Sequence, residues 1–269
     1  MNLPEPFTFS QNNLQDYADC HYRFLLRHVH HLEWPAVESE PLLEQEARID
    51  LGFQFHRLVQ QYFCGIDIKI LSESIEDPLL QEWWSTFLIL DLQELPGAKF
   101  AEKMLSVPFK EHRLVAKYDL LVVGKSGQVL IYDWKTTTFQ PKRQSLIQRM
   151  QSRVYPALLM LQRERISPIA VSSPEDIRMT YWFPAFPDTP VAFDYSRSQY
   201  EQDLLILGNM VDEIIAKEEV EFNKTDDERK CKFCRYRSLC ERGVEAGTTP
   251  EDGTELPPEN PFEFDFDAL

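Results

Sequence analysis

Two acidic residues and a lysine in neighbouring β-rich segments have the spacing expected of a divalent-cation site. Asp133 and Lys135 flank a tryptophan in the run YDWK, and side chains two residues apart in a strand point to the same face. Asp119 lies in the preceding β-rich run, and the intervening GKSG (124–127) is typical of a hairpin turn. Folding about this turn places Asp119 within about one residue of directly opposite Asp133, where side chains are roughly 5 Å apart.

Such a pair of carboxylates would bind a hard metal ion. Two carboxylates at this distance repel each other unless a cation lies between them, and oxygen ligands of this kind suit Mg²⁺ or Mn²⁺. The ion can polarise a phosphate oxygen and lower the pKa of a bound water. Lys135 would orient or deprotonate that water, or balance charge in the transition state. The same residues also fit an ordinary salt bridge on a strand surface, so their context must decide.

The rest of the chain predicts helices around a small antiparallel sheet. Apolar residues at helical spacing predict helices at 10–25, 41–64, 77–93, 144–165 and 196–219. Short β-rich runs predict strands at 99–109, 114–123, 128–137 and 177–183. One α/β domain spanning residues 1–242 is expected.

Composition describes a soluble protein with an acidic end. The formal net charge of −16 argues against a basic nucleic-acid binder, but no Lys or Arg follows Arg242, and eight acidic residues there carry half of that charge. Residues 243–269 therefore predict a disordered acidic tail. No apolar run approaches the roughly 18 residues needed to cross a bilayer, so we expect a cytoplasmic protein without a membrane partner.

Four motifs in a fixed order supply the missing context. A histidine ends the run GFQFH at His56, Asp119 and the triplet Asp133-Trp134-Lys135 follow, and the run QSRVY (151–155) comes next on a predicted helix. This ordered set resembles the motifs of RecB-like nucleases of the PD-(D/E)XK superfamily. The resemblance implies a restriction-endonuclease-like mixed sheet flanked by helices.

The resemblance also implies roles for individual residues. The metal ligands would be His56, Asp119, Asp133 and the backbone carbonyl of Trp134, and Lys135 would be the catalytic lysine. Gln151 and Tyr155, which are four residues apart on one helical face, would act with them by contacting the substrate near the scissile phosphate. Glu102, on the first predicted strand, is a weaker candidate for an additional acidic residue.

The cysteines form a second pattern. Cys231, Cys234 and Cys240 follow the spacing C-x2-C-x5-C, and Cys20 lies more than two hundred residues upstream. Closing so long a loop with a metal would constrain the chain strongly. The arrangement resembles the 4Fe–4S site of RecB-like nucleases such as AddB and the CRISPR-adaptation exonucleases, which implies a helical cap held by the cluster. Zinc remains an alternative for four cysteines. The fifth cysteine, Cys64, is expected to be buried.

Two classes of function follow from these patterns. The resemblance implies an Mg²⁺- or Mn²⁺-dependent deoxyribonuclease, an exonuclease in the first place, which hydrolyses phosphodiester bonds in DNA repair, recombination or CRISPR-type processing. Its partners would be single-stranded DNA or duplex ends and a helicase or recombination protein. The alternative is a non-catalytic iron–sulfur subunit that binds DNA or docks a partner within a helicase–nuclease complex. The intact Asp119, Asp133 and Lys135 favour catalysis.

Overall fold

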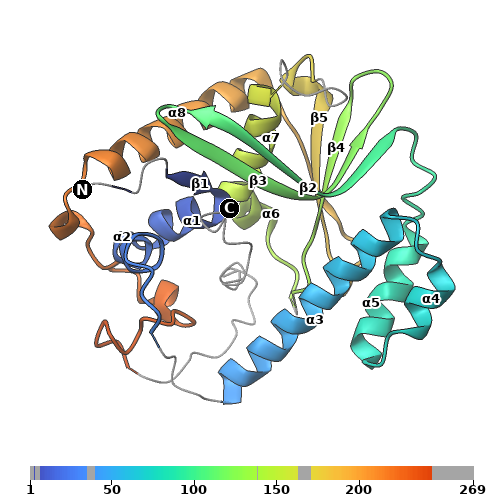
Figure 1. The fold of residues 1–269 in the computed structure, drawn as a ribbon, viewed down its shortest axis with the longest axis horizontal. Coiled ribbons are helices and arrows are strands. Elements are labelled where there is room, and N and C mark those ends of the chain that lie inside the picture. Colours follow the sequence, from blue (N-terminus) through green and yellow to red (C-terminus); the bar gives the residue numbers. More distant parts are fainter. Residues whose placement is uncertain (1–2, 4–6, 35–39, 138, 163–170, 244–269) are drawn as a thin grey trace.

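A six-stranded sheet with helices on both faces forms the body of the protein, shown in Figure 1. The computed structural model describes residues 3, 7–34, 40–137, 139–162 and 171–243. The strands are β1 (Thr8–Ser10), β2 (Ala98–Phe109), β3 (His112–Val123), β4 (Val129–Trp134), β5 (Ile177–Trp182) and β6 (Val191–Asp194). The helices are α1 (Gln11–Asp19), α2 (His21–Phe24), α3 (Glu40–Phe63), α4 (Ile68–Glu73), α5 (Pro78–Ile89), α6 (Arg143–Gln148), α7 (Met150–Gln162) and α8 (Arg197–Ala216). The acidic tail predicted from residue 243 lies, beyond its first residue, outside the described part of the chain.

The sheet is mixed and not purely antiparallel as the β-rich runs predicted. Antiparallel pairing joins β2 to the whole of β3, β3 to β4, and β5 to β6. Parallel pairing joins β1 to β3 and β4 to β5. A parallel pair needs a crossover connection, and α6 and α7 supply it between β4 and β5. The sequence missed β1 and β6 because strands of three and four residues are too short to show alternation.

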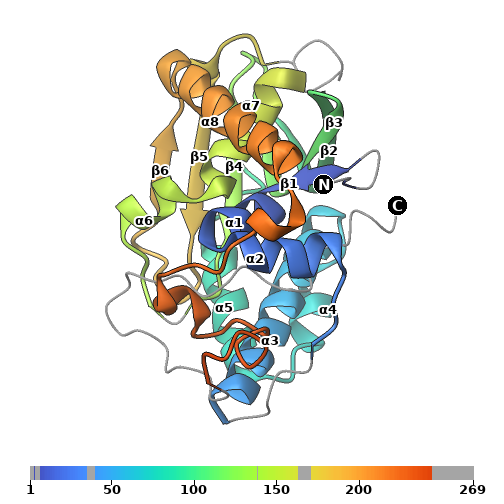
Figure 2. The same ribbon diagram turned by 90° about the vertical axis from the view of Figure 1, so that its left-hand side faces the viewer.

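Two hydrophobic cores lie on the two faces of the sheet. The larger core packs α1, α7 and α8 against one face, and Leu114, Leu158 and Val211 are among its fully buried members. The smaller core packs α3 and α5 against the other face through aromatic residues such as Phe55 and Trp134. Figures 1 and 2 show these two groups of helices on opposite sides of the strands. The functional residues described below come from the layer between the two cores.

Two predicted helices are interrupted at positions that the apolar spacing did not indicate. The helix predicted from Ser10 to residue 25 begins as expected, because the Ser10 hydroxyl accepts from the backbone N–H of Asn13. It stops at Cys20, whose backbone is extended (φ −164°, ψ 110°), and resumes as α2. The helix predicted at 144–165 is likewise divided into α6 and α7 by the extended backbone of Arg149. Cys20 therefore lies at a junction and not within a helix.

A buried carboxylate holds the two parts of this interrupted helix together. Asp16 forms ion pairs with Arg23 (2.8 Å) and Arg27 (3.0 Å) and a hydrogen-bonded contact with His28 (2.8 Å). Burial alone would raise the pKa of Asp16, but the charges of Arg23 and Arg27 and the contact with His28 hold it well below its usual value. The carboxylate is therefore ionised in the folded protein and fixes α2 relative to α1.

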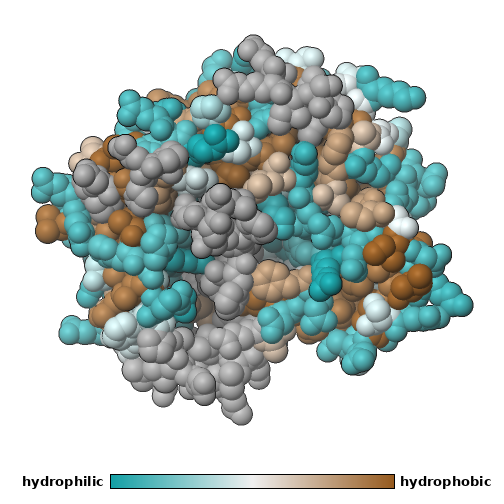
Figure 3. Space-filling view, viewed as in Figure 1, coloured by the Kyte–Doolittle hydropathy of each residue, from teal (hydrophilic) through white to brown (hydrophobic). Residues whose placement is uncertain are grey.

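Exposed apolar side chains gather on the outer helices. Ile66, Ile68 and Ile70 are exposed before and within α4, and Figure 3 shows hydrophobic surface over α4 and α5. Within the described residues, none of the helices has the length and apolar character that crossing a lipid bilayer requires. The exposed patch is a local feature of this helical layer.

Replacing Asp16 by asparagine is expected to lower the free energy of unfolding at pH 7 by roughly 2–3 kcal/mol, because Arg23 and Arg27 lose a buried partner. Since folding lowers the pKa of Asp16, its contribution is complete above about pH 4, the pKa in the unfolded chain, and disappears as the pH falls further. Urea unfolding of wild type and Asp16→Asn at several pH values measures this. The exposed pair of Asp212 with Lys110 provides the control, and Asp212→Asn should change stability by less than about 0.5 kcal/mol.

Candidate functional site

Three acidic residues lie in a row across β2, β3 and β4. Pairing of Ala101 with Leu120 and of Lys103 with Tyr118 sets Glu102 opposite Asp119. The ladder between β3 and β4 runs from Val123–Val129 to Leu120–Tyr132, so the next opposing positions are Asp119 and Asp133. The side chains of Glu102, Asp119 and Asp133 are 9%, 12% and 2% exposed. Three carboxylates are thus drawn together in a nearly buried place.

In both strands of the β2–β3 hairpin, the regular alternation of side chains between the two cores is interrupted at this row. On β3, Tyr118 packs in the larger core and Leu120 in the smaller core, although residues two apart in a regular strand share a face. On β2 the change falls at Glu102, whose backbone is left-handed (φ 50°). A left-handed residue other than glycine costs roughly 1 kcal/mol. Glu102 and Asp119 therefore lie at the point in each strand where this alternation is interrupted.

A histidine from α3 completes a compact group of ligand atoms. His56 Nδ1 lies 3.4 Å from Asp119 Oδ1 and 3.8 Å from Glu102 Oε1, and its Nε2 lies 3.2 Å from the carbonyl oxygen of Trp134. Burial would lower the pKa of His56, but the Asp119 and Glu102 carboxylates raise it well above its usual value. In the described chain, His56, Glu102 and Asp119 each offer a ligand atom within 4.8 Å of the others. This donor set suits a divalent cation.

Asp133 lies beside this group and is held by other partners. Its carboxylate forms an ion pair with Lys135 Nζ at 3.0 Å and accepts a hydrogen bond from Gln151 Nε2 at 2.5 Å. The backbone N–H of Trp134 donates to Asp119 Oδ2 at 2.8 Å, which ties the two aspartates together through the main chain. Burial raises the pKa of Asp133 despite the opposing charge of Lys135, and the nearby Asp119 raises it further. A cation between the two aspartates would relieve this repulsion.

Tyr155 occupies an opening in the sheet. On one edge of β3, β1 pairs with residues 113–115 and β4 with residues 120–123, so no strand of the described chain lies beside residues 116–119 there. The Tyr155 hydroxyl donates to the carbonyl oxygen of Lys117 (2.6 Å) in that opening, and Tyr118 in turn donates to the carbonyl oxygen of Tyr155 (2.8 Å). Tyr155 is fully buried, so the structure places it behind the site and not where the resemblance had it contact substrate. Gln151, also buried, faces Asp133.

Glu102 is the residue that sequence reasoning undervalued. It belongs to the compact group with His56 and Asp119, and it also forms an ion pair with Lys117. The hairpin pairs residues up to Phe109 and His112, which leaves a two-residue turn. Counting back from this turn along both strands sets Glu102 opposite Asp119, so the signal was present once the turn was located.

The four predicted cysteines line one pocket beside the junction of α1 and α2. Cys20, Cys231, Cys234 and Cys240 are all among the lining residues of this pocket, which is partly open to solvent. Cationic side chains share the lining, and Arg242 contacts the sulfur of Cys231 at 3.2 Å. Cys64 is exposed and not buried as predicted, and it takes no part in this pocket.

A family model confirms the class of protein that these features suggest. The model that describes the PD-(D/E)XK nuclease superfamily matches residues 8–241. The chain belongs to this superfamily. The match includes the carboxylate row, His56, Lys135 and the four cysteines of the pocket, so it covers nearly all of the described chain.

Two solved structures are similar to this PD-(D/E)XK nuclease along most of their length. A "Putative exonuclease" from Eubacterium rectale is 11% identical, with 91% of each chain covered and a TM-score of 0.49. The protein SSO0001 is 9% identical, with 89% of this chain and 88% of that chain covered and a TM-score of 0.40. No curated protein matches the sequence. At these identities the two structures do not bear on the substrate.

Adding Mn²⁺ is expected to raise the thermal unfolding midpoint, because the ion binds the folded site and relieves repulsion between carboxylates. At roughly 100 times the Kd the stabilisation is about 2.7 kcal/mol, or roughly 5 °C for a chain of this size. The double variant His56→Ala/Asp119→Ala should lose the shift, measured against its own metal-free midpoint. Asp194→Ala, which removes an exposed carboxylate on β6, should keep it. An equal shift in all three proteins would exclude an ion at this site.

Proposed function

We propose that this member of the PD-(D/E)XK superfamily is an Mg²⁺- or Mn²⁺-dependent DNA exonuclease of the RecB-like type. The observation that carries the proposal is the row of Glu102, Asp119 and Asp133, joined by His56 on one side and Lys135 on the other. The ordered sequence motifs support the RecB-like assignment and the exonuclease activity. DNA, as a single strand or a duplex end, is the proposed substrate.

The residues present fit a divalent ion. His56, Glu102 and Asp119 offer ligand atoms close together, and the carbonyl oxygen of Trp134 and the carboxylate of Asp133 adjoin them. When bound, the ion would polarise the scissile phosphate and make a water molecule a better nucleophile. Carboxylate oxygens and one imidazole are compatible with Mg²⁺ and Mn²⁺.

The protein's own groups would hold and balance the substrate. Lys135 is partly exposed and lies 3.0 Å from Asp133, so its ammonium group can contact a phosphate while it stays paired with Asp133. Its charge would offset the negative charge that increases on the phosphate oxygens as the water oxygen attacks phosphorus and the bond to the leaving oxygen breaks. Gln151 holds Asp133 from the buried side, and Tyr155 holds the backbone of β3, so both position the ligands without contact with DNA.

We further propose that the four cysteines bind a 4Fe–4S cluster. The four cysteines that line one pocket, from Cys20 and the C-terminal segment, and the cationic side chains in the same lining, which would offset the charge of thiolate ligands, support this proposal. The cluster would join the start of the chain to residues 231–240 and hold the helical cap closed. On this proposal residues 1–242 form one nuclease domain, and residues 243–269 form an acidic tail available to a helicase or recombination partner.

Wild-type protein with Mn²⁺ is expected to degrade linear DNA and to leave closed circular DNA intact, because an exonuclease needs an end. Asp133→Ala should lower the rate by about 1,000-fold, as expected when a preorganised charge is removed from such a site. Asp194→Ala is the matched control and should cut at the wild-type rate, since this carboxylate pairs with Arg178 at the sheet edge. Gel analysis of labelled DNA gives both results. Equal cutting by wild type and Asp133→Ala, or none by either, would favour the non-catalytic subunit instead.

Freshly purified protein is expected to be brown, with broad absorption near 400 nm from iron–sulfide charge transfer. Cys234→Ser should lose the colour and lower the thermal midpoint, because the cluster joins distant parts of the chain. Cys64→Ser, which changes an exposed cysteine outside the pocket, should retain both. A colourless wild type that contains zinc would replace the iron–sulfur proposal by a zinc site.

A further inference from the structure

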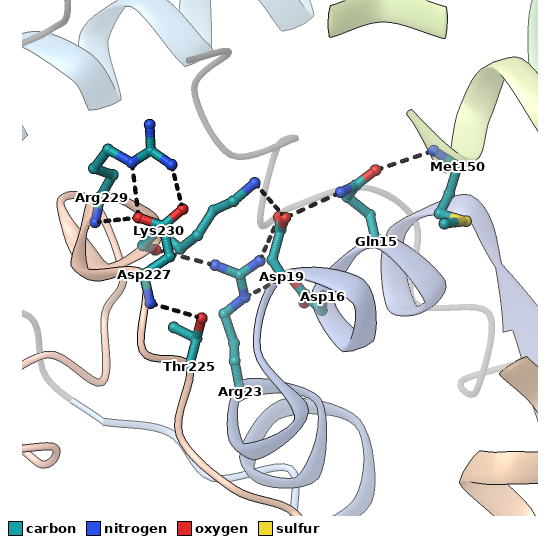
Figure 4. Close-up of polar contacts among 9 residues, drawn as sticks. All are labelled: Gln15, Asp16, Asp19, Arg23, Met150, Thr225, Asp227, Arg229 and Lys230. Atoms are coloured by element: carbon teal, nitrogen blue, oxygen red, sulfur yellow. Dashed lines mark hydrogen bonds and ion pairs between the residues drawn. The ribbon is translucent and has the colours of Figure 1, made fainter. Parts of the chain in front are cut away.

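A side chain on another helix accepts a hydrogen bond from the first turn of α7. The first backbone N–H groups of a helix have no partner within the helix and need an outside acceptor. The N–H of Met150, the first residue of α7, donates to Oε1 of Gln15 on α1 at 3.0 Å (Figure 4). Gln15 is therefore a cap for α7 that comes from a segment 135 residues away in the sequence.

The other end of the Gln15 amide faces the surroundings of the cysteine pocket. Its Nε2 donates to Asp19 Oδ1 at 3.2 Å, and Figure 4 shows Gln15 lying between Met150 and Asp19. Asp19 is fixed by two cations, Arg23 Nη2 at 2.9 Å and Lys230 Nζ at 2.7 Å. Asp19 directly precedes Cys20, and Lys230 directly precedes Cys231. The position of Gln15 thus depends on both segments that bring cysteines to the pocket.

On the side of the nuclease site, the next residue of α7 is Gln151. Its Nε2 donates to Asp133 Oδ1 at 2.5 Å, and Tyr181 donates to its Oε1 at 3.5 Å. A continuous series of contacts therefore runs from the cysteine pocket through Asp19, Gln15 and the start of α7 to the carboxylate of Asp133. An amide is suited to the middle of this series because it accepts at one end and donates at the other.

We propose that Gln15 is a positioning residue for the nuclease site. By accepting a hydrogen bond from the Met150 N–H, it sets the position of the first turn of α7 and therefore of Gln151. The position of Gln15 in turn depends on how Asp19 is held beside the cysteine pocket. The inference rests on the proposed nuclease function. A displacement of a catalytic group by about 1 Å can lower a rate about 100-fold, so a helix start left uncapped is enough to affect turnover. Gln15 itself contacts neither the metal ligands nor substrate.

The first test is a double-mutant cycle on kcat in the full-length protein as purified. Gln15→Ala should lower kcat about 10-fold and leave KM for a DNA end unchanged. In the Gln151→Ala background, Gln15→Ala should have no further effect, because the contact through which it acts is gone. Gln81→Ala is the matched control: it removes a glutamine hydrogen bond to the carbonyl of Ile75 at the distant α5 and should keep wild-type kcat.

Two further variants separate positioning from simple stabilisation. Gln15→Glu keeps an acceptor for the Met150 N–H at the helix N-terminus but can no longer donate to Asp19, so it should lose less kcat than Gln15→Ala without matching wild type. Asp19→Ala removes the partner of Gln15 and should lower kcat in the wild-type background but not in the Gln15→Ala background. Thermal midpoints of Gln15→Ala and Asp19→Ala show whether these variants lose kcat because they lose stability. The positioning role does not require a loss of stability.

The outcomes distinguish this inference from the proposed function. Effects of Gln15→Ala that multiply with those of Gln151→Ala, or an equal loss of kcat in Gln15→Ala and Gln15→Glu, would overturn the positioning role while the nuclease stands. Asp19→Ala with wild-type kcat would overturn the connection to the cysteine pocket. Wild-type protein that cleaves no DNA with Mn²⁺ would remove the proposed function and this inference together.

Discussion

Repulsion among three carboxylates in adjacent strands is the constraint on which the rest of the site depends. Two unit charges 5 Å apart repel by roughly 3 kcal/mol at an effective dielectric constant of 20. The fold offsets this by giving each carboxylate a cationic or hydrogen-bonding neighbour: Lys117 contacts Glu102, His56 contacts Asp119, and Lys135 contacts Asp133. The row is therefore tolerated in the folded protein and remains a favourable place for a divalent ion.

Helix α7 connects the carboxylate row to the rest of the fold. One of its side chains, Tyr155, satisfies a carbonyl group where β3 lacks a neighbouring strand, and another, Gln151, fixes the buried aspartate. The helix packs in the larger core while these two polar groups face the sheet. The hydrogen bond from Tyr155 thus takes the place of one from a neighbouring strand at this opening, and the site residues lie beside it.

The sequence predicted more of the site than of its surroundings. Motif order named His56, Asp119, Asp133 and Lys135, and the hairpin turn at residues 124–127 placed Asp119 near Asp133, in agreement with the register of β3 and β4. The parallel pairing of β4 with β5 and the break at Cys20 depend on contacts between distant segments, which local patterns do not encode. The burial of Tyr155 was missed for the same reason, since it follows from the gap between β1 and β4.

The two-residue turn between β2 and β3 limits how this protein can vary. Glu102 and Asp119 come from opposite arms of one hairpin, and an inserted or deleted residue in the turn would shift one arm by a single place. Every acid and base of the site would still be present in the sequence, yet Glu102 would point to the opposite face. Among homologues, length changes should therefore collect in other loops, and a chain that keeps the motifs but alters this turn should be suspected of having lost the site.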